Sequence, residues 1–183
     1  MIKSQTWITS DTHFYHYNIL KYCKPSRPFS DVNEMNEVIV SRWNALISPI
    51  DRVYILGDVA FADPQKSAHV VNRCNGEKIL ITGNHDAKNL KDFNYRRCFA
   101  EIHSYLTIDY NGTFVVMFHY PIWEWDQMHG GSVHFHGHLH GRRHRIDGRI
   151  LDVGMDSNNC TPILLDSAVK QALQQPIRHH YPM

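Results

Sequence analysis

The first half of the chain alternates short apolar runs with stretches that carry a helical pattern. Apolar runs rich in β-branched residues at positions 2–10, 52–56 and 78–82 predict buried strands. Residues 31–47 repeat apolar side chains at helical spacing, with Asp31 and Glu34 in the positions of a capping box. A second helix is expected over residues 63–74, where Pro64 suits a first helical turn. Strands that alternate with helices favour parallel crossovers, so we expect a largely parallel sheet here.

The second half of the chain has a different pattern. β-rich runs at 105–110 and 113–119 flank Asn111-Gly112, a dipeptide typical of tight hairpins. Further strands are predicted at 132–136 and 150–153, and a last helix from residue 166 or 167 to about 175. The two halves together predict one α/β domain over residues 1–183. We expect a parallel half and an antiparallel half, with two mixed β-sheets packed as a sandwich flanked by helices.

Composition excludes several classes of function. Lys plus Arg is 19 and Asp plus Glu is 18, so the net charge of +1 indicates no polyanion-binding field. The four cysteines are scattered without a C-x-x-C pair, which favours reduced thiols in a cytoplasm. The N-terminus lacks an apolar leader, and no apolar run approaches the roughly 18 residues of a membrane helix. We therefore expect a soluble cytoplasmic protein without membrane contact.

Five of the 14 histidines, together with aspartates and an asparagine, fall in short polar blocks. Each block follows a predicted strand, and the carboxyl ends of parallel strands meet at one edge of a sheet. In Asp-x-His and His-x-His pairs, residues two apart on an extended segment point the same way and can face one cation. Imidazole and carboxylate together favour Mn, Fe, Zn or Ni. The blocks are residues 11–13, 57–59, 83–86, 119–121 and 137–141.

Each block taken alone has a structural explanation. An isolated histidine at a strand end is more often a hydrogen-bonded structural residue than a ligand. A single aspartate such as Asp11 or Asp58 is more often a turn former or a helix N-cap. Only the five blocks together indicate a metal site.

The ordered set D-x-H, G-D, G-N-H-D, H and G-H-x-H resembles that of the calcineurin-like metallophosphoesterases, of the small single-domain bacterial and phage type. The resemblance covers nearly the whole chain, and residues 152–159, before Thr161-Pro162-Ile163, are also similar to the closing segment of such proteins. It implies the αββα fold of that family and two divalent metal ions. By this resemblance Asp11, His13 and His140 bind the first ion, Asn84, His119 and His138 bind the second, and Asp58 bridges them.

The resemblance also implies a reaction. Two cations about 3.5–4 Å apart share a hydroxide that attacks phosphorus in line, and they stabilise the growing charge. His85 is the expected proton donor to the leaving oxygen, with Asp86 orienting it. A hydrogen bond without proton transfer is the alternative for His85. Mn²⁺ is the expected cofactor, with Fe, Zn or Ni as alternatives.

The expected activity is hydrolysis of a small phosphate ester, a phosphodiester in the first place, with cyclic nucleotides among the candidates. The alternatives are a phosphomonoesterase or protein phosphatase, and a nuclease acting on RNA or DNA ends. A non-catalytic scaffold is disfavoured because His85 and the full ligand set are present. Tyr15 and Asp152 stand where close relatives usually have Gly and Asn, which leaves the substrate size open. The oligomeric state is also left open.

Several side chains are candidates for contact with substrate. His16 follows the first metal block, although a solvent-exposed helix start explains it as well. Arg142 and Arg143 follow the His-x-His pair and can bind phosphate, with a solvated hairpin as the alternative. Trp123 and Trp125 can stack a nucleobase, although ordinary packing is the commoner role of such aromatics.

Overall fold

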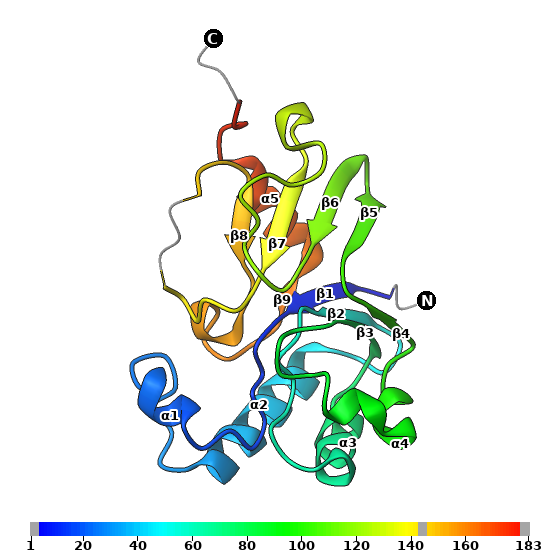
Figure 1. The fold of residues 1–183 in the computed structure, drawn as a ribbon, viewed down its shortest axis with the longest axis vertical. Coiled ribbons are helices and arrows are strands. Elements are labelled where there is room, and N and C mark those ends of the chain that lie inside the picture. Colours follow the sequence, from blue (N-terminus) through cyan, green and yellow to red (C-terminus); the bar gives the residue numbers. More distant parts are fainter. Residues whose placement is uncertain (1–3, 143–145, 180–183) are drawn as a thin grey trace.

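The computed structural model describes residues 4–142 and 146–179, which contain two β-sheets (Figure 1). The first sheet has five strands in the order β4-β3-β2-β1-β9. Strands β1 to β4 run parallel, as the alternating pattern predicted, and the short β9 is antiparallel to β1. The strands are β1 (Thr6–Thr9), β2 (Arg52–Ile55), β3 (Glu77–Ile81), β4 (Glu101–His103) and β9 (Ile163–Leu164).

The second sheet has the order β5-β6-β7-β8. The predicted hairpin is confirmed: β5 and β6 are antiparallel, and Asn111 and Gly112 have φ angles of 53° and 80°. The expected antiparallel half is wrong, however, because β6, β7 and β8 pair in parallel. Residues 118–132 and 137–149 are long enough to return the chain to the same end of the sheet, as a parallel pair requires. The strands are β5 (Leu106–Tyr110), β6 (Thr113–Met117), β7 (Val133–His136) and β8 (Ile150–Asp152).

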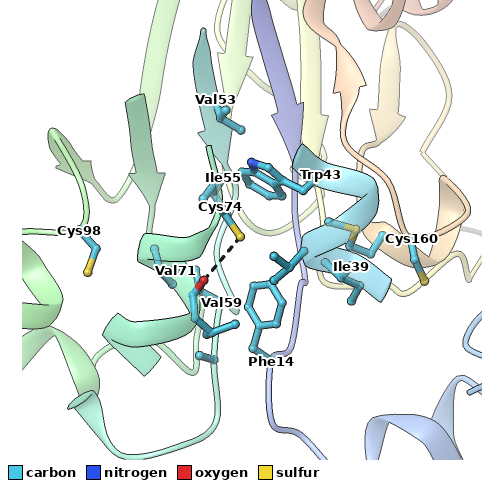
Figure 2. Close-up of a cluster of buried hydrophobic side chains, with 14 of the residues drawn as sticks. Phe14, Ile39, Trp43, Val53, Ile55, Val59, Val71, Cys74, Cys98 and Cys160 are labelled. Carbon is cyan, nitrogen blue, oxygen red and sulfur yellow. Dashed lines mark hydrogen bonds between the residues drawn. The ribbon is translucent and has the colours of Figure 1, made fainter. Parts of the chain in front are cut away.

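Side chains of the first sheet alternate between two hydrophobic layers. Val53 and Ile55 of β2 pack with the helices on one face, in the cluster of Figure 2. Tyr54 and Leu56 belong to a second cluster that contains residues of both sheets. This alternation follows the pleat of a strand buried on both faces. The two sheets therefore pack against each other, with helices on the outer face of the first sheet.

Helix α2 (Val32–Leu46) begins where the sequence predicted, and Asp31 accepts hydrogen bonds from the N–H groups of Asn33 and Glu34. The capping box is only half correct, because the Glu34 carboxylate accepts from Ser30 rather than from Asp31. Helix α3 (Pro64–Arg73) is capped by Asp63. The remaining helices are α1 (Ile19–Tyr22), η1 (Asn89–Lys91), α4 (Phe93–Arg96), η2 (Met128–Gly130), η3 (Met155–Ser157) and α5 (Leu165–Leu173).

The loops that follow the strands at one edge of the sandwich carry the polar blocks. Trp43 of α2 and Cys74 after α3 are buried in the hydrophobic cluster between the helices and the first sheet (Figure 2). All four cysteines are buried free thiols. Among the described residues, no helix combines the length and the apolar character needed to cross a bilayer.

Candidate metal centre

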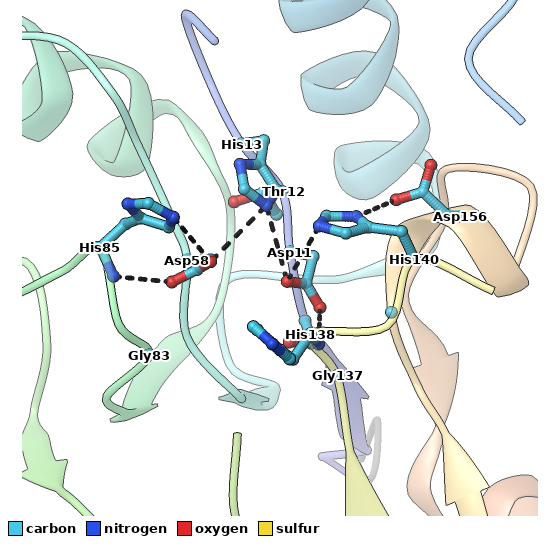
Figure 3. Close-up of polar contacts among 12 residues, drawn as sticks. Asp11, Thr12, His13, Asp58, Gly83, His85, Gly137, His138, His140 and Asp156 are labelled. Atoms are coloured by element: carbon cyan, nitrogen blue, oxygen red, sulfur yellow. Dashed lines mark hydrogen bonds and ion pairs between the residues drawn. The ribbon is translucent and has the colours of Figure 1, made fainter. Parts of the chain in front are cut away.

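The predicted ligands of the polar blocks come together at the edge of the sandwich (Figure 3). Three groups of potential ligand atoms form among the described residues, and within each group the atoms lie within 4.8 Å of one another. One of them, Cys23 with His140 and Asp156, shares His140 with the group of Asp11 and His13. The other two groups contain six of the seven ligands expected from the sequence, with Asp58 in the second group. The first group is Asp11, His13 and His140, and the second is Asp58, His119 and His138.

Asp58 lies between the two groups. Its Oδ2 atom is 3.7 Å from Nε2 of His13 and 3.7 Å from Nε2 of His119. Its Oδ1 atom accepts a hydrogen bond of 3.0 Å from the backbone N–H of His85. The Oδ1 atom of Asn84 is 3.0 Å from Nε2 of His119, which brings the asparagine to the second group. A carboxylate oxygen that faces both groups has the geometry required of a bridging ligand.

The imidazole rings are oriented by contacts on their far side. His119 uses Nδ1 to contact the carbonyl oxygen of Leu56 at 2.6 Å. His140 uses Nδ1 to contact Oδ2 of Asp156 at 2.8 Å. His13 uses Nδ1 to contact Nδ1 of His16 at 3.0 Å. In all three rings Nε2 faces the centre. Metal-binding histidines commonly have this arrangement, in which one ring nitrogen binds the metal and the other is held by a neighbouring group.

Two buried atoms at the centre lack a hydrogen-bond partner among the described residues: Oδ1 of Asp11 and Nε2 of His13. The other oxygen of Asp11 accepts the backbone N–H of His138 at 2.8 Å. A buried polar group without a partner is unfavourable by about 1–3 kcal/mol. A divalent cation bound between Asp11 and His13 would satisfy both atoms, and oxygen with imidazole nitrogen is a donor set that suits Mn, Fe, Zn or Ni. The residues present therefore fit a metal ion.

The backbone is strained at the same place. Left-handed backbone costs about 1–2 kcal/mol for a residue with a side chain. Such strain concentrates at functional sites, where the surrounding structure imposes it. The affected ligands and their φ angles are Asp11 (57°), His13 (51°), Asp58 (54°), His138 (68°) and His140 (53°).

Two glycines allow the loops to approach the ligands closely. A Cβ atom on Gly83 would lie 2.4 Å from Oδ1 of Asp58. A Cβ atom on Gly137 would lie 2.2 Å from Oδ2 of Asp11. Both contacts are closer than a side chain permits, so glycine is required at these positions.

The centre perturbs the protonation of its own groups. Burial raises the pKa of Asp11, but the neighbouring imidazole of His13, with Nε2 3.6 Å from Oδ1, outweighs burial and brings the pKa to about 2. Burial lowers the pKa of His13 to about 4. Burial also lowers the pKa of His140, but the hydrogen bond to Asp156 outweighs it and raises the pKa to about 10. A cation that binds His140 must therefore displace a proton.

Asp86 has contacts that differ from the expected ones. Its Oδ2 atom accepts hydrogen bonds from the N–H groups of Asp58 at 2.9 Å and Gly83 at 2.7 Å, and Oδ1 accepts from Val59 at 3.0 Å. The expectation that this carboxylate orients His85 is therefore corrected. Asp86 joins the loop after β2 to the loop after β3.

His85 lies at the exposed side of the centre. Its side chain is 48% exposed, and Nε2 is 3.9 Å from Oδ2 of Asp58. The ring of Phe61 is 4.6 Å from it, centroid to centroid. His85 thus stands beside the ligands, with access to solvent.

The expected substrate contacts have mixed outcomes. His16 stacks on Phe61 at 3.9 Å and directs Nδ1 to His13, so it contacts a ligand. Arg142 is exposed and borders a cavity of about 400 Å³. Arg143 lies outside the described residues.

The two tryptophans differ in their surroundings. Trp125 is buried and donates from Nε1 to Ser132, so its proposed role in stacking a nucleobase is wrong. Trp123 is exposed, and the guanidinium of Arg178 lies 3.9 Å from the centre of its ring.

Sequence reasoning missed two buried residues at the centre. Arg27 is fully buried and forms an ion pair of 2.8 Å with Asp156. Asp156 lies in the closing segment that the resemblance singled out, but no role was assigned to it. Arg27 lies in a polar stretch with no strand or metal block beside it, so no local signal marks it.

Comparisons with known proteins identify relatives but no activity. No family model matches this chain. It is 32% identical to the uncharacterized protein MJ1445 of Methanocaldococcus jannaschii, over 93% of this chain and 92% of that protein. It is 27% identical to the Gene 66 protein of Mycobacterium phage L5, over 84% and 87% of the two chains. The crystal structure of the protein of unknown function AQ665 from Aquifex aeolicus is similar, with a TM-score of 0.73 and 26% identity, over 92% of this chain and 100% of that one.

Proposed function

Since this chain belongs to the same family as the uncharacterized protein MJ1445 of Methanocaldococcus jannaschii, whose name states no activity, we propose a function from the site itself. The protein is a calcineurin-like phosphodiesterase that uses two divalent cations to hydrolyse small phosphodiesters. The observation that carries this proposal is the position of Asp58, with one carboxylate oxygen 3.7 Å from Nε2 of both His13 and His119.

The proposed centre binds Mn²⁺, with Fe, Zn or Ni as alternatives, because its donors are oxygen and imidazole nitrogen. When bound, two such cations supply Lewis-acid stabilisation of phosphate charge and lower the pKa of a bound water. The unpartnered buried atoms of Asp11 and His13 support this assignment. In the proposal Asp11, His13 and His140 bind one cation, Asn84, His119 and His138 bind the other, and Asp58 contacts both.

His85 is the proposed proton donor to the leaving oxygen. Its backbone N–H is fixed on Oδ1 of Asp58, while its ring is half exposed beside the ligands. The ring can therefore reach an ester oxygen at the centre without being a ligand itself. Positioned acid catalysis of this kind typically contributes about 10²–10⁴-fold to the rate.

The surroundings of the centre favour a diester over a monoester. The ring of Phe61 is 4.9 Å from His13 on one side, and the ring of Tyr120 is 4.5 Å from His138 on the other. A phosphodiester carries an organic group on each side of phosphorus, and the exposed ring of Tyr120 offers apolar surface to one of them.

Turnover of matched substrates tests the proposal. The protein is stripped with a chelator, reloaded with Mn²⁺, and assayed with a nitrophenyl diester, a nitrophenyl monoester, and 2′,3′- and 3′,5′-cyclic nucleotides. We expect diesters to be hydrolysed faster than the monoester, and Asp58→Asn to abolish turnover. A short RNA in the same assay tests nuclease activity. Preference for the monoester would make the protein a phosphomonoesterase, and absence of all turnover would overturn the enzymatic proposal.

A further inference from the structure

We infer that the buried pair Arg27 and Asp156 positions the ligands of one proposed cation, the one assigned to Asp11, His13 and His140. The inference rests on the proposed metal centre. It assigns to that position a support that the other position does not share, so that one position can be weakened while the other is kept.

Asp156 is held by contacts to both of its carboxylate oxygens. Oδ2 accepts from Nδ1 of His140 at 2.8 Å (Figure 3) and from Nη2 of Arg27 at 2.8 Å. Oδ1 accepts from Nε of Arg27 at 2.9 Å and from Oγ of Ser26 at 2.6 Å. The bidentate contact with Arg27 fixes the plane of the carboxylate. That plane in turn fixes the ring of His140 with Nε2 toward Asp11.

Arg27 extends the same contacts to the loop after β1. Its Nη2 atom donates to the carbonyl oxygen of Asp11 at 2.6 Å, and Nη1 donates to that of Thr12 at 3.0 Å. The carbonyls belong to the strained segment that carries Asp11 and His13. One guanidinium therefore connects that segment to His140, which lies far along the chain. A charge buried in this way is stable only when it is paired, so loss of Asp156 removes the pairing from Arg27 as well.

The ligands of the other cation have different supports. His119 is oriented by the carbonyl oxygen of Leu56. The loops that carry Asp58 and Asn84 are joined through Asp86. Asp86 thus supports Asn84 and the shared residue Asp58, whereas Asp156 and Arg27 support only ligands of the position assigned to Asp11, His13 and His140. Removal of an outer partner of a ligand typically weakens metal binding by about 10- to 100-fold.

Calorimetric titration of the metal-free protein with Mn²⁺ tests this assignment, with electron paramagnetic resonance to distinguish coupled from isolated ions. In wild type we expect two binding events and a coupled spectrum. Asp156→Asn is expected to weaken one event by about 10- to 100-fold, to leave the other unchanged, and to give the spectrum of an isolated Mn²⁺ at one equivalent. Arg27→Lys keeps the charge but lacks the planar guanidinium that donates two hydrogen bonds to one carboxylate. We expect it to weaken the same binding event.

The controls separate this effect from general damage. Glu77→Gln breaks an exposed ion pair with Arg52 and should leave both events unchanged. Asp156→Asn combined with His119→Ala should weaken both binding events, because each change acts on a different cation position. If Asp156→Asn does not fold, Ser26→Ala removes one hydrogen bond from Asp156 and should weaken the same event to a smaller degree.

The outcomes distinguish the inference from the proposed function. If wild type binds two Mn²⁺ ions and the folded variants bind both with unchanged or equally weakened affinity, the positioning role is wrong and the proposed centre stands. If wild type binds none, the proposed function falls and the inference falls with it.

Discussion

The backbone N–H of His138 donates a hydrogen bond of 2.8 Å to Oδ2 of Asp11, across 127 residues of sequence. This bond joins the loop after β7 in the second sheet to the loop after β1 in the first. It occupies one oxygen of Asp11 and leaves the other without a partner among the described residues. The centre is therefore built at the contact between the two sheets.

Gly137→Ala should disrupt this contact. The added Cβ atom would lie 2.2 Å from Oδ2 of Asp11 and 2.0 Å from Oγ of Ser10, so the loop must shift away from the first sheet. We expect a loss of about 1–3 kcal/mol of stability, typical of overpacking, together with reduced Mn²⁺ content. Thermal unfolding and metal analysis measure the two effects. Gly130→Ala is the control, because its Cβ would meet nothing closer than 4.0 Å. Wild-type stability and metal content in Gly137→Ala would contradict the geometry.

His85→Ala should separate metal binding from catalysis. The ring is half exposed and is not among the proposed ligands, so both cations should be retained. Turnover of diesters with poor leaving groups should fall by about 10²–10⁴-fold, whereas a nitrophenyl leaving group needs little help from an acid. The measurement compares the turnover of these two kinds of diester in the variant and in wild type. His103→Ala, which lies away from the centre, is the control. If the variant hydrolysed both substrates at the wild-type rate, His85 would not be the proton donor.

His16→Ala distinguishes two roles for this residue. The sequence suggested substrate contact, whereas the structure directs Nδ1 of His16 to Nδ1 of His13 at 3.0 Å. If His16 orients His13, the variant should bind Mn²⁺ about 10-fold more weakly. The KM measured at saturating Mn²⁺ should then stay near that of wild type. A raised KM with unchanged metal affinity would favour substrate contact instead.

Acid should weaken the metal-free protein through Asp156. Burial raises the pKa of this carboxyl, but hydrogen bonds from His140 and Arg27 and the charge of Arg27 outweigh burial and hold the pKa below its ordinary 3.8. A depressed folded-state pKa stabilises the fold above about pH 4, and that stabilisation is lost as pH falls below it. Urea unfolding between pH 7 and pH 3 should therefore show a smaller acid-induced loss for Asp156→Asn than for wild type. Asp166→Asn, which alters an exposed pair with Lys170, should keep the wild-type loss. Identical profiles for wild type and Asp156→Asn would contradict the assignment.

The features that could be predicted from the sequence are those that local patterns encode. The apolar runs of β1, β2 and β3 and the turn at Asn111-Gly112 depend on neighbouring residues, and they appear where expected. The strands β4 (Glu101–His103) and β9 (Ile163–Leu164) were missed because they are short and form only by pairing with an existing sheet. The direction of β7 depends on the path of the loop before it, which no local pattern encodes.

The same limit applies to the centre. The polar blocks that follow the strands were expected to converge, and the structure brings their side chains together. The resemblance paired Asp86 with His85, yet the Asp86 carboxylate accepts hydrogen bonds from the backbone of the loop after β2. Arg27 and Asp156 are separated by 129 residues, so their contact exists only in the folded chain.

The central claim is that two cations lie on either side of Asp58, and anomalous scattering from a crystal of the protein soaked with Mn²⁺ tests it most directly. We expect two anomalous peaks about 3.5–4 Å apart, one beside His13 and His140 and the other beside His119 and His138. The Asp58 carboxylate should contact both peaks. A single peak, or no peak at these residues in fully loaded crystals, would contradict the account.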